Sequence, residues 1–211
     1  MLHSLRQGVL ISESEFSELA GREGLSKEIK NLFRRYVLKV SQDEIDLEEL
    51  KKRGLTVGEE TYIYSVGSID HIYPHLISIG RDVTISTNVT ILAHDASTTV
   101  VKCGTKLGRV SIGDNVFIGT GTTILCNTKI GNNVVVGARS LVTCDLPDNG
   151  VYAGIPAKRI CSIEDFRERN KALRKARPDF SEIKPWYEWT NATEQERQAM
   201  IDGLQDGIGF I

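Results

Sequence analysis

The sequence predicts a mainly β protein built as a solenoid of hexapeptide repeats. Neither an α-helix, with its period of 3.6 residues, nor a simple strand, with its period of two, produces a repeat of six residues. Short strands joined by tight corners do produce one, and three strands then close a coil that stacks on the next by parallel pairing. An aliphatic residue occupies every sixth position of one long stretch, at Ile112, Ile118, Ile124, Ile130, Val136 and Val142.

The residues at the expected corners support the same fold. A tight corner needs a positive φ, which Gly adopts freely and Asn or Asp tolerates. With Arg139 as the exception, the third residue after each aliphatic is of this kind: Asn115, Gly121, Asn127, Asn133, Arg139 and Asp145.

The repeat continues toward the N-terminus. Ile79, Ile85 and Ile91 keep the spacing of six, with Asp82, Asn88 and His94 at their corners, and Val57, Ile63 and Ile69 come before them. Between Ile91 and Ile112 the spacing is lost over a non-repeating loop, residues 94–109. We therefore expect a β solenoid domain over residues 55–160 that is interrupted chiefly by this loop.

The two flanks are expected to be helical. Residues 1–54 contain an apolar helical face in SKEIKNLFRRYVLKV, followed by a capping box from Ser41 to Glu44 and a stop at Gly54. Residues 161–211 contain two further helix starts, at Ser162 and Thr193. An aromatic cluster in this extension fits either packing or stacking on a sugar, and consists of Trp186, Tyr187 and Trp189.

Composition excludes several classes of protein. The net charge of −2 gives no basic surface for nucleic acid. No apolar run approaches the ~20 residues that a membrane span needs. The first residues are too polar for a signal peptide, so we expect a cytoplasmic protein.

The four cysteines form no CxxC pair, which argues against a zinc knuckle. Cys126 and Cys144 are 18 residues apart, so they are expected on adjacent coils at a strand spacing of ~4.8 Å, within reach of a disulfide. Two neighbouring free thiols are the expected state in a cytoplasmic protein, with the disulfide as the alternative.

His94 is the candidate catalytic residue, because it stands where the repeat gives way to the loop. A histidine titrates near neutral pH and can accept a proton from a hydroxyl or an amine. The spacing alone is equally compatible with a structural histidine at a corner.

Two long segments resemble the hexapeptide-repeat acyltransferase family, closest to its sugar O-acetyltransferase branch, which includes maltose and galactoside acetyltransferases and polysaccharide-modifying relatives. They are ISIGRDVTISTNVTILAHDAS and VSIGDNVFIGTGTTILCNTKIGNNVVVGARSLVTCDLPDNGVYAGIPAKRI, together covering most of residues 78–160. The resemblance implies a left-handed coil, a homotrimer with active sites between subunits, and acetyl-CoA as the donor. It also implies that His94 is the general base, which takes a proton as the acceptor hydroxyl attacks the thioester.

The resemblance further assigns candidate cofactor residues. By position rather than by resemblance, Asp95, next to His94, and His75, 19 residues before it and so roughly one coil away, are candidates for catalytic support or substrate contact, and either fits a purely structural role. The family's lysine and a further basic position fall on Cys144 and Cys161, two departures that weaken the expected phosphate binding. The candidates for CoA binding are Thr120, Ala138, Thr143, Lys158 and Arg159.

The expected function is therefore acetyl transfer to a hydroxyl of a sugar or polysaccharide precursor. One alternative is N-acetylation of an amino sugar or a nucleotide-linked amino sugar. A second is a zinc site of His71, His75 and His94, although the loop lacks the second histidine that such sites use. A third is a non-catalytic scaffold.

Overall fold

The computed structural model describes residues 46–66, 68–181, 183, 186–205 and 207–211. The expected helical region of residues 1–54 lies mostly outside this part of the chain, and so does the capping box from Ser41 to Glu44. Within the described residues, no helix combines the length and the apolar character that crossing a membrane requires.

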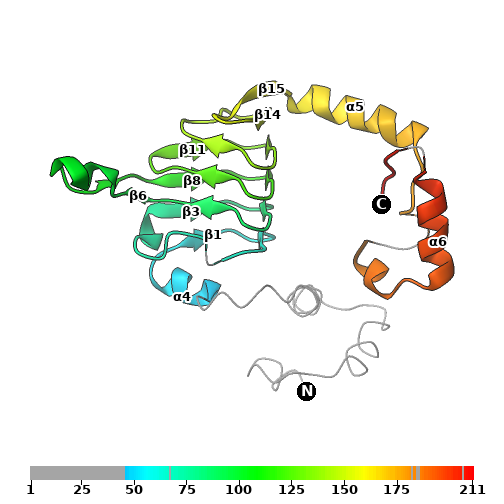
Figure 1. Cartoon of the computed structure of the whole chain (residues 1–211), viewed down its shortest axis with the longest axis horizontal. Helices are drawn as coiled ribbons and strands as arrows, with labels where there is room; N and C mark the ends of the chain where they lie inside the picture. Colours follow the sequence, from blue (N-terminus) through cyan, green and yellow to red (C-terminus); the bar gives the residue numbers. More distant parts are fainter. Residues whose placement is uncertain (1–45, 67, 182, 184–185, 206) are drawn as a thin grey trace, which may run out of the picture. The chain divides into compact units, whose positions relative to one another are not determined.

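Short parallel strands form most of the structure and are stacked in coils (Figure 1). The first sheet contains β1 (Thr56–Val57), β3 (Ile77–Ile79), β8 (Val110–Ile112) and β11 (Thr128–Ile130). The second contains β2 (Tyr62–Ile63), β4 (Thr84–Ile85), β9 (Val116–Ile118), β12 (Val134–Val136), β14 (Gly150–Ala153) and β15 (Lys158–Ser162). The third contains β5 (Thr90–Ile91), β10 (Thr123–Ile124) and β13 (Leu141–Val142).

From β8 to β13 the chain visits the first, second and third sheets in turn and then repeats the cycle. Residues 18 positions apart are therefore neighbours, as in the pairs Ile118↔Val136 and Ile124↔Val142. The aliphatic residues of the repeat from Ile69 to Val142 point inward and are at most 3% exposed, whereas Val57 and Ile63 are partly buried. The predicted mainly β class and parallel stacking are confirmed.

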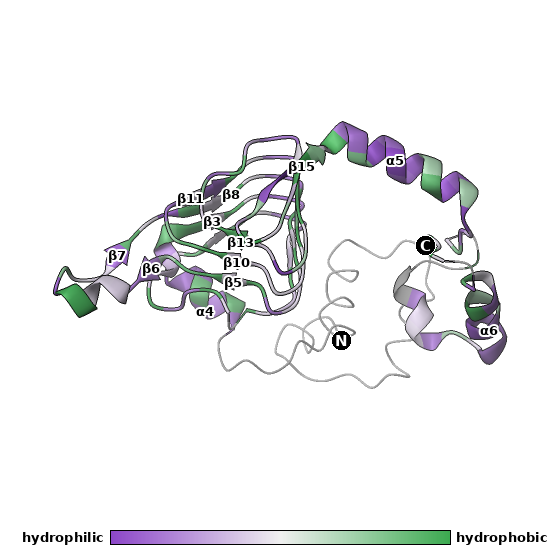
Figure 2. Cartoon of the chain, turned by 45° about the horizontal axis from the view of Figure 1, so that its top comes forward, coloured by the Kyte–Doolittle hydropathy of each residue, from purple (hydrophilic) through white to green (hydrophobic). Residues whose placement is uncertain are grey.

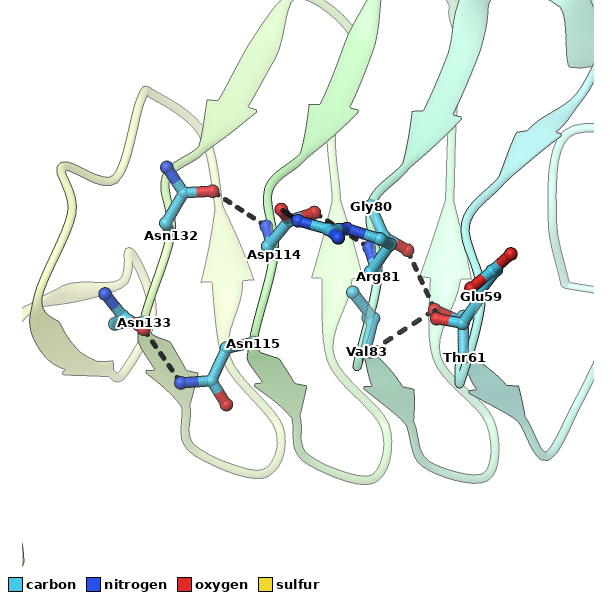
Figure 3. A network of polar contacts seen from close by, with 9 residues as sticks. All are labelled: Glu59, Thr61, Gly80, Arg81, Val83, Asp114, Asn115, Asn132 and Asn133. Atoms are coloured by element: carbon cyan, nitrogen blue, oxygen red, sulfur yellow. Dashed lines mark hydrogen bonds and ion pairs between the residues drawn. The ribbon is translucent and has the colours of Figure 1, made fainter. Parts of the chain in front are cut away.

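Tight corners between the sheets have positive φ, as predicted. The residues concerned are Asp82, Asn88, Asn115, Gly121, Asn127, Asn133 and Arg139. Side chains at one corner also link successive coils: the Asn115 amide donates to Asn133 Oδ1 over 2.8 Å, and the Asn133 amide donates to Asn149 Oδ1 over 2.9 Å. Figure 3 shows the first of these bonds, beside a second row in which Asn132 accepts from the Asp114 N–H and Asp114 pairs with Arg81.

The corner prediction was wrong at His94 and Asp145, neither of which has a positive φ. His94 instead begins β6 (His94–Asp95), which pairs antiparallel with β7 (Lys106–Leu107), because a hairpin is inserted between Ala93 and Gly108. At Asp145 the coil is two residues shorter than the repeat, since Ile130 faces Leu146 rather than residue 148.

Helices flank the coils. Near the N-terminal end, α4 (Leu47–Lys52) is capped by Asp46 and buries Leu50 in the core, and Gly54 follows the helix with a φ of 102°. After β15 comes α5 (Ile163–Ala176), where Ser162 accepts from the Asp165 N–H as predicted. Next are η3 (Trp186–Asn191) and α6 (Glu194–Gly203), with the predicted capping box of Thr193 and Glu196.

Candidate active site

His94 and Asp70 form a hydrogen-bonded pair at the base of the inserted hairpin. The His94 Nδ1 atom faces Asp70 Oδ2. The Asp70 side chain is fully buried, whereas 26% of the His94 side chain is exposed. The imidazole is therefore held through its Nδ1 edge while the side chain as a whole stays partly exposed.

Asp70 is held as a carboxylate by several donors. Its Oδ1 accepts from the N–H groups of Ile72 at 3.0 Å and Tyr73 at 3.1 Å, and its Oδ2 accepts from the Ala93 N–H at 2.9 Å. Burial alone raises the pKa of Asp70, but the bonds from His94 and from these backbone groups outweigh burial and hold it below its usual value of 3.8.

The charge on Asp70 fixes the chemistry that His94 can perform. An ionised carboxylate only accepts hydrogen bonds, so the proton between the two groups belongs on His94 Nδ1. In the neutral ring Nε2 then carries a lone pair. That atom is able to accept a proton, and the buried carboxylate stabilises the imidazolium that results.

Tyr73 packs edge-on against the imidazole. The centroids of the Tyr73 and His94 rings are 5.4 Å apart, with 65° between the ring planes. The ring of His75, which is exposed, also lies edge-on to Tyr73, with the ring centroids 6.2 Å apart. His75 lies in the turn η1 (Pro74–Leu76), which Tyr73 precedes. Ring contacts thus link His75 to His94 through Tyr73.

The side chain of Asp95 forms its hydrogen bonds with residues other than His94. Its Oδ1 accepts from the Ser97 N–H at 2.8 Å and its Oδ2 pairs with Lys106 Nζ at 2.9 Å. These bonds, led by that from Lys106, lower the pKa of Asp95. The contacts of Asp95 hold the start of the hairpin, which continues through η2 (Ser97–Val101).

Two candidate cofactor residues, Thr120 and Ala138, lie together at the corner between the second and third sheets. The Arg139 N–H donates to the Thr120 carbonyl over 2.8 Å, and a methyl group on Gly119 would come within 2.5 Å of the Ala138 nitrogen. Both residues are exposed.

Lys158 and Arg159 lie on β15, which pairs antiparallel with β14 in the coil that follows. Lys158 pairs with Ala153, which lies beside Gly137, the residue before Ala138, so Lys158 lies one strand beyond β14 near the same corner. Arg159 also donates to the Asn149 carbonyl over 3.4 Å. Both cations are exposed.

Thr143 lies at the opposite end of the third sheet. It directly follows β13, just as Leu92 follows β5, and β10 joins these two strands in register. Thr143 therefore belongs to the end of the sheet from which the His94 hairpin leaves. The third sheet thus connects the corner of Thr120 and Ala138 with the corner of His94.

Sequence reasoning missed Asp70. The available signal was a break in the repeat, since Ile69 and Ile79 are ten residues apart and Asp70 opens that irregular segment. Among the described residues, no three His, Cys, Asp or Glu side chains are grouped in a way that would hold a metal ion.

Comparison with known proteins gives consistent similarities. Residues 109–144 match the family model of the bacterial transferase hexapeptide, with six repeats. The chain is 38% identical over 146 residues to Protein CapG of Staphylococcus aureus, covering 67% of this chain and 83% of CapG. It is 33% identical over 152 residues to galactoside O-acetyltransferase of Lactococcus lactis, covering 61% of this chain and 73% of that enzyme.

Another relative is YvoF of Bacillus subtilis, whose name assigns it provisionally to the acetyltransferases. The chain is 38% identical to it over 117 residues, and the match covers 56% of this chain and 66% of YvoF. Among solved structures, a hexapeptide-repeat acetyltransferase of Vibrio cholerae matches with a TM-score of 0.47 and 20% identity, covering 65% of this chain and 94% of that one.

Proposed function

Because this chain belongs to the hexapeptide-repeat acyltransferase family, we propose that it transfers an acetyl group from acetyl-CoA to a hydroxyl of a sugar or polysaccharide precursor. Its similarity to a named galactoside O-acetyltransferase supports the choice of acceptor. The observation that carries the proposal is the pair of a buried Asp70 carboxylate and a partly exposed His94 imidazole.

The proposal includes the architecture around this pair. The parallel coils of residues 55–160 are the catalytic domain and form a left-handed β-helix, with helical regions before and after it. Three copies assemble into a homotrimer with the active sites between subunits. The half-open position of His94, on the hairpin that leaves the coils, is compatible with a site that a second subunit completes.

In the proposed mechanism His94 is the general base. Its Nε2 accepts the proton of the acceptor hydroxyl as the oxygen forms a bond to the acetyl carbonyl carbon. Asp70 stabilises the resulting imidazolium, and His94 then returns the proton to the sulfur as the carbon–sulfur bond breaks. Acetyl-CoA supplies the activated thioester, and general base catalysis of this kind contributes ~10²–10⁴ in rate.

The exposed residues beside the third sheet and on the last strand of the second sheet fit a CoA molecule. Lys158 and Arg159 provide positive charge for phosphate groups, and the small side chain of Ala138 leaves the neighbouring corner open for the pantetheine arm. Thr120 and Thr143 provide hydroxyl groups at the two ends of the third sheet. Asp95 supports this site by holding the hairpin through Lys106, and His75 supports it through its contact with Tyr73.

The test is the release of free CoA thiol from acetyl-CoA, measured with a panel of sugars that carry free hydroxyl or free amino groups. We expect transfer to a hydroxyl acceptor, and a His94→Ala variant whose kcat/KM falls by ~10²–10⁴. His71→Ala, which changes an exposed histidine outside the pair, is the matched control. Undiminished turnover by His94→Ala would reject the mechanism, and a preference for amino sugars would replace O-acetylation with N-acetylation.

A further inference from the structure

Cys126 and Cys144 each lie two residues beyond a paired position on adjacent coils. Ile124 pairs with Val142, and the Leu125 N–H donates to the Val142 carbonyl over 3.0 Å, so the strand pairing ends just before the two cysteines, where the later coil becomes two residues shorter. Parallel strands lie ~4.8 Å apart, inside the range of Cα separations that a disulfide spans. Both thiols are free, with Cys126 half-buried and Cys144 exposed.

Along the third sheet, Cys126 lies one strand, and Cys144 two strands, from the base of the hairpin that carries His94. Ile91 pairs with Ile124, which places Ala93 beside Cys126, and His94 is the next residue. A negative charge at Cys126 would attract the ammonium group of Lys106, which pairs with Asp95. A change at Cys126 therefore acts on the contacts that hold the hairpin.

We propose that Cys126 and Cys144 form a reversible thiol–disulfide switch that alters the hairpin of residues 94–109. The oxidant is a low-molecular-weight disulfide. The exposed Cys144 thiolate attacks one of its sulfurs, forming a mixed disulfide and releasing one thiolate. The Cys126 thiolate then attacks the Cys144 sulfur, forming the internal disulfide and releasing the second thiolate.

The exchange is balanced in electrons and atoms. The two protein thiols lose two protons and two electrons in total, and the small disulfide is reduced to two thiols. The product ties two coils together near the base of the hairpin that carries His94. Its effect on acetyl transfer depends on the proposed function, because a shift of the base away from its working position lowers kcat/KM by about tenfold or more.

The primary experiment detects the bond itself. The whole chain is incubated with glutathione disulfide, remaining thiols are blocked with iodoacetamide, and unreduced peptides are identified by mass spectrometry. We expect one crosslinked species that joins the peptides of Cys126 and Cys144 and disappears with dithiothreitol. Cys144→Ser should abolish it, whereas Cys161→Ser and Cys103→Ser should retain it. Mixed glutathione disulfides without this crosslink would overturn the proposal.

A second measurement tests the switch independently of catalysis. Hydrogen exchange of the peptide containing residues 94–109 is compared between the reduced and oxidised chains, with Cys144→Ser treated in the same way. We expect a change on oxidation in the wild type and none in the variant. A crosslink that leaves this exchange unchanged would reject the switch. If the reduced enzyme did not transfer acetyl groups, the proposed function would fail, but the crosslink and hydrogen-exchange results would still decide the switch.

Discussion

At the scale of single residues, the orientation of His94 is decided by a buried charge. A carboxylate removed from water is costly unless it is fully hydrogen-bonded, and Asp70 meets this requirement with three backbone N–H groups and His94. The backbone donors would hold the carboxylate even when the ring is absent. Asp70 is thus a positioning residue: the backbone fixes the carboxylate, and the carboxylate in turn fixes the imidazole.

The pKa of Asp70 leads to a prediction about acid stability. The pKa of Asp70 in the folded chain lies below 3.8, so the unfolded chain takes up the proton first as the pH falls. The free energy of unfolding therefore decreases as the pH falls from about 3.8 through the folded-state pKa. Above this range the carboxylate contributes fully, so Asp70→Asn should lower the free energy of unfolding at pH 7 by about 1.5–3 kcal/mol, the usual contribution of hydrogen bonds to a charged group.

The measurement is urea unfolding at pH 7 and at pH 3 for both chains. The difference between wild type and Asp70→Asn should shrink at the lower pH, because Asp70 of the unfolded wild type then takes up a proton and the carboxylate contributes less to stability. Asp202→Asn, at an exposed position of α6, provides the control for removing a charge. A difference that stays constant between the two pH values would contradict the assignment.

The sequence pointed to His94 but not to its partner, for a physical reason. Asp95 is the neighbour in the chain, yet the antiparallel pairing of the hairpin turns it toward Lys106. Asp70 is 24 residues away in the sequence and lies in a segment without the repeat. No periodicity fixes where such a segment returns, so its contact with His94 emerged only from the folded chain.

At the scale of the element, the corners are the most regular feature after the core. A left-handed backbone conformation costs an ordinary residue roughly 1–2 kcal/mol, and Asn is among the residues that tolerate it best. Asn115, Asn133 and Asn149 all adopt it, and their amides are joined from coil to coil. One residue type therefore serves both the turn and the link between turns.

Two substitutions at Asn133 separate these contributions. Asn133→Gly keeps the backbone conformation and loses the two amide bonds, whereas Asn133→Ala loses the bonds and also strains a φ of 54°. We expect Asn133→Ala to unfold at a lower urea concentration than Asn133→Gly, with a difference in unfolding free energy of about 1 kcal/mol. Equal stability of the two variants would show that the corner is unstrained.

The corner residues show which elements a sequence can reveal. Six-residue spacing fixes which side chains point inward, and so the third position of each segment falls at a turn. The prediction held wherever the coil kept its full length, even at Arg139, and it was wrong at His94 and Asp145, where residues are inserted or missing. A repeat predicts its own continuation, but it does not predict the structure of an insertion.

At the scale of the whole molecule, the inserted hairpin presents apolar side chains that the described chain leaves uncovered. Val100 is 86% exposed and Val101 is 66% exposed, and Figure 2 shows the hydrophobic colour at this end of the hairpin. Adjacent exposed aliphatic groups on a projecting segment favour association. In the proposed homotrimer, this tip is the element best placed to reach a second subunit.

The tip therefore provides a test of assembly. The wild type should have the mass of three 23.4 kDa chains by light scattering. Val100→Asp should shift this mass toward the monomer, because association would bury an unpaired carboxylate, and turnover should fall in parallel if the active sites lie between subunits. Thr105→Asp adds the same charge to an exposed polar position of the same hairpin and should leave the trimer intact. A monomeric wild type with full activity would contradict an active site shared between subunits. A Val100→Asp variant that stays trimeric would mean that the subunits contact each other through the coils and not through the hairpin.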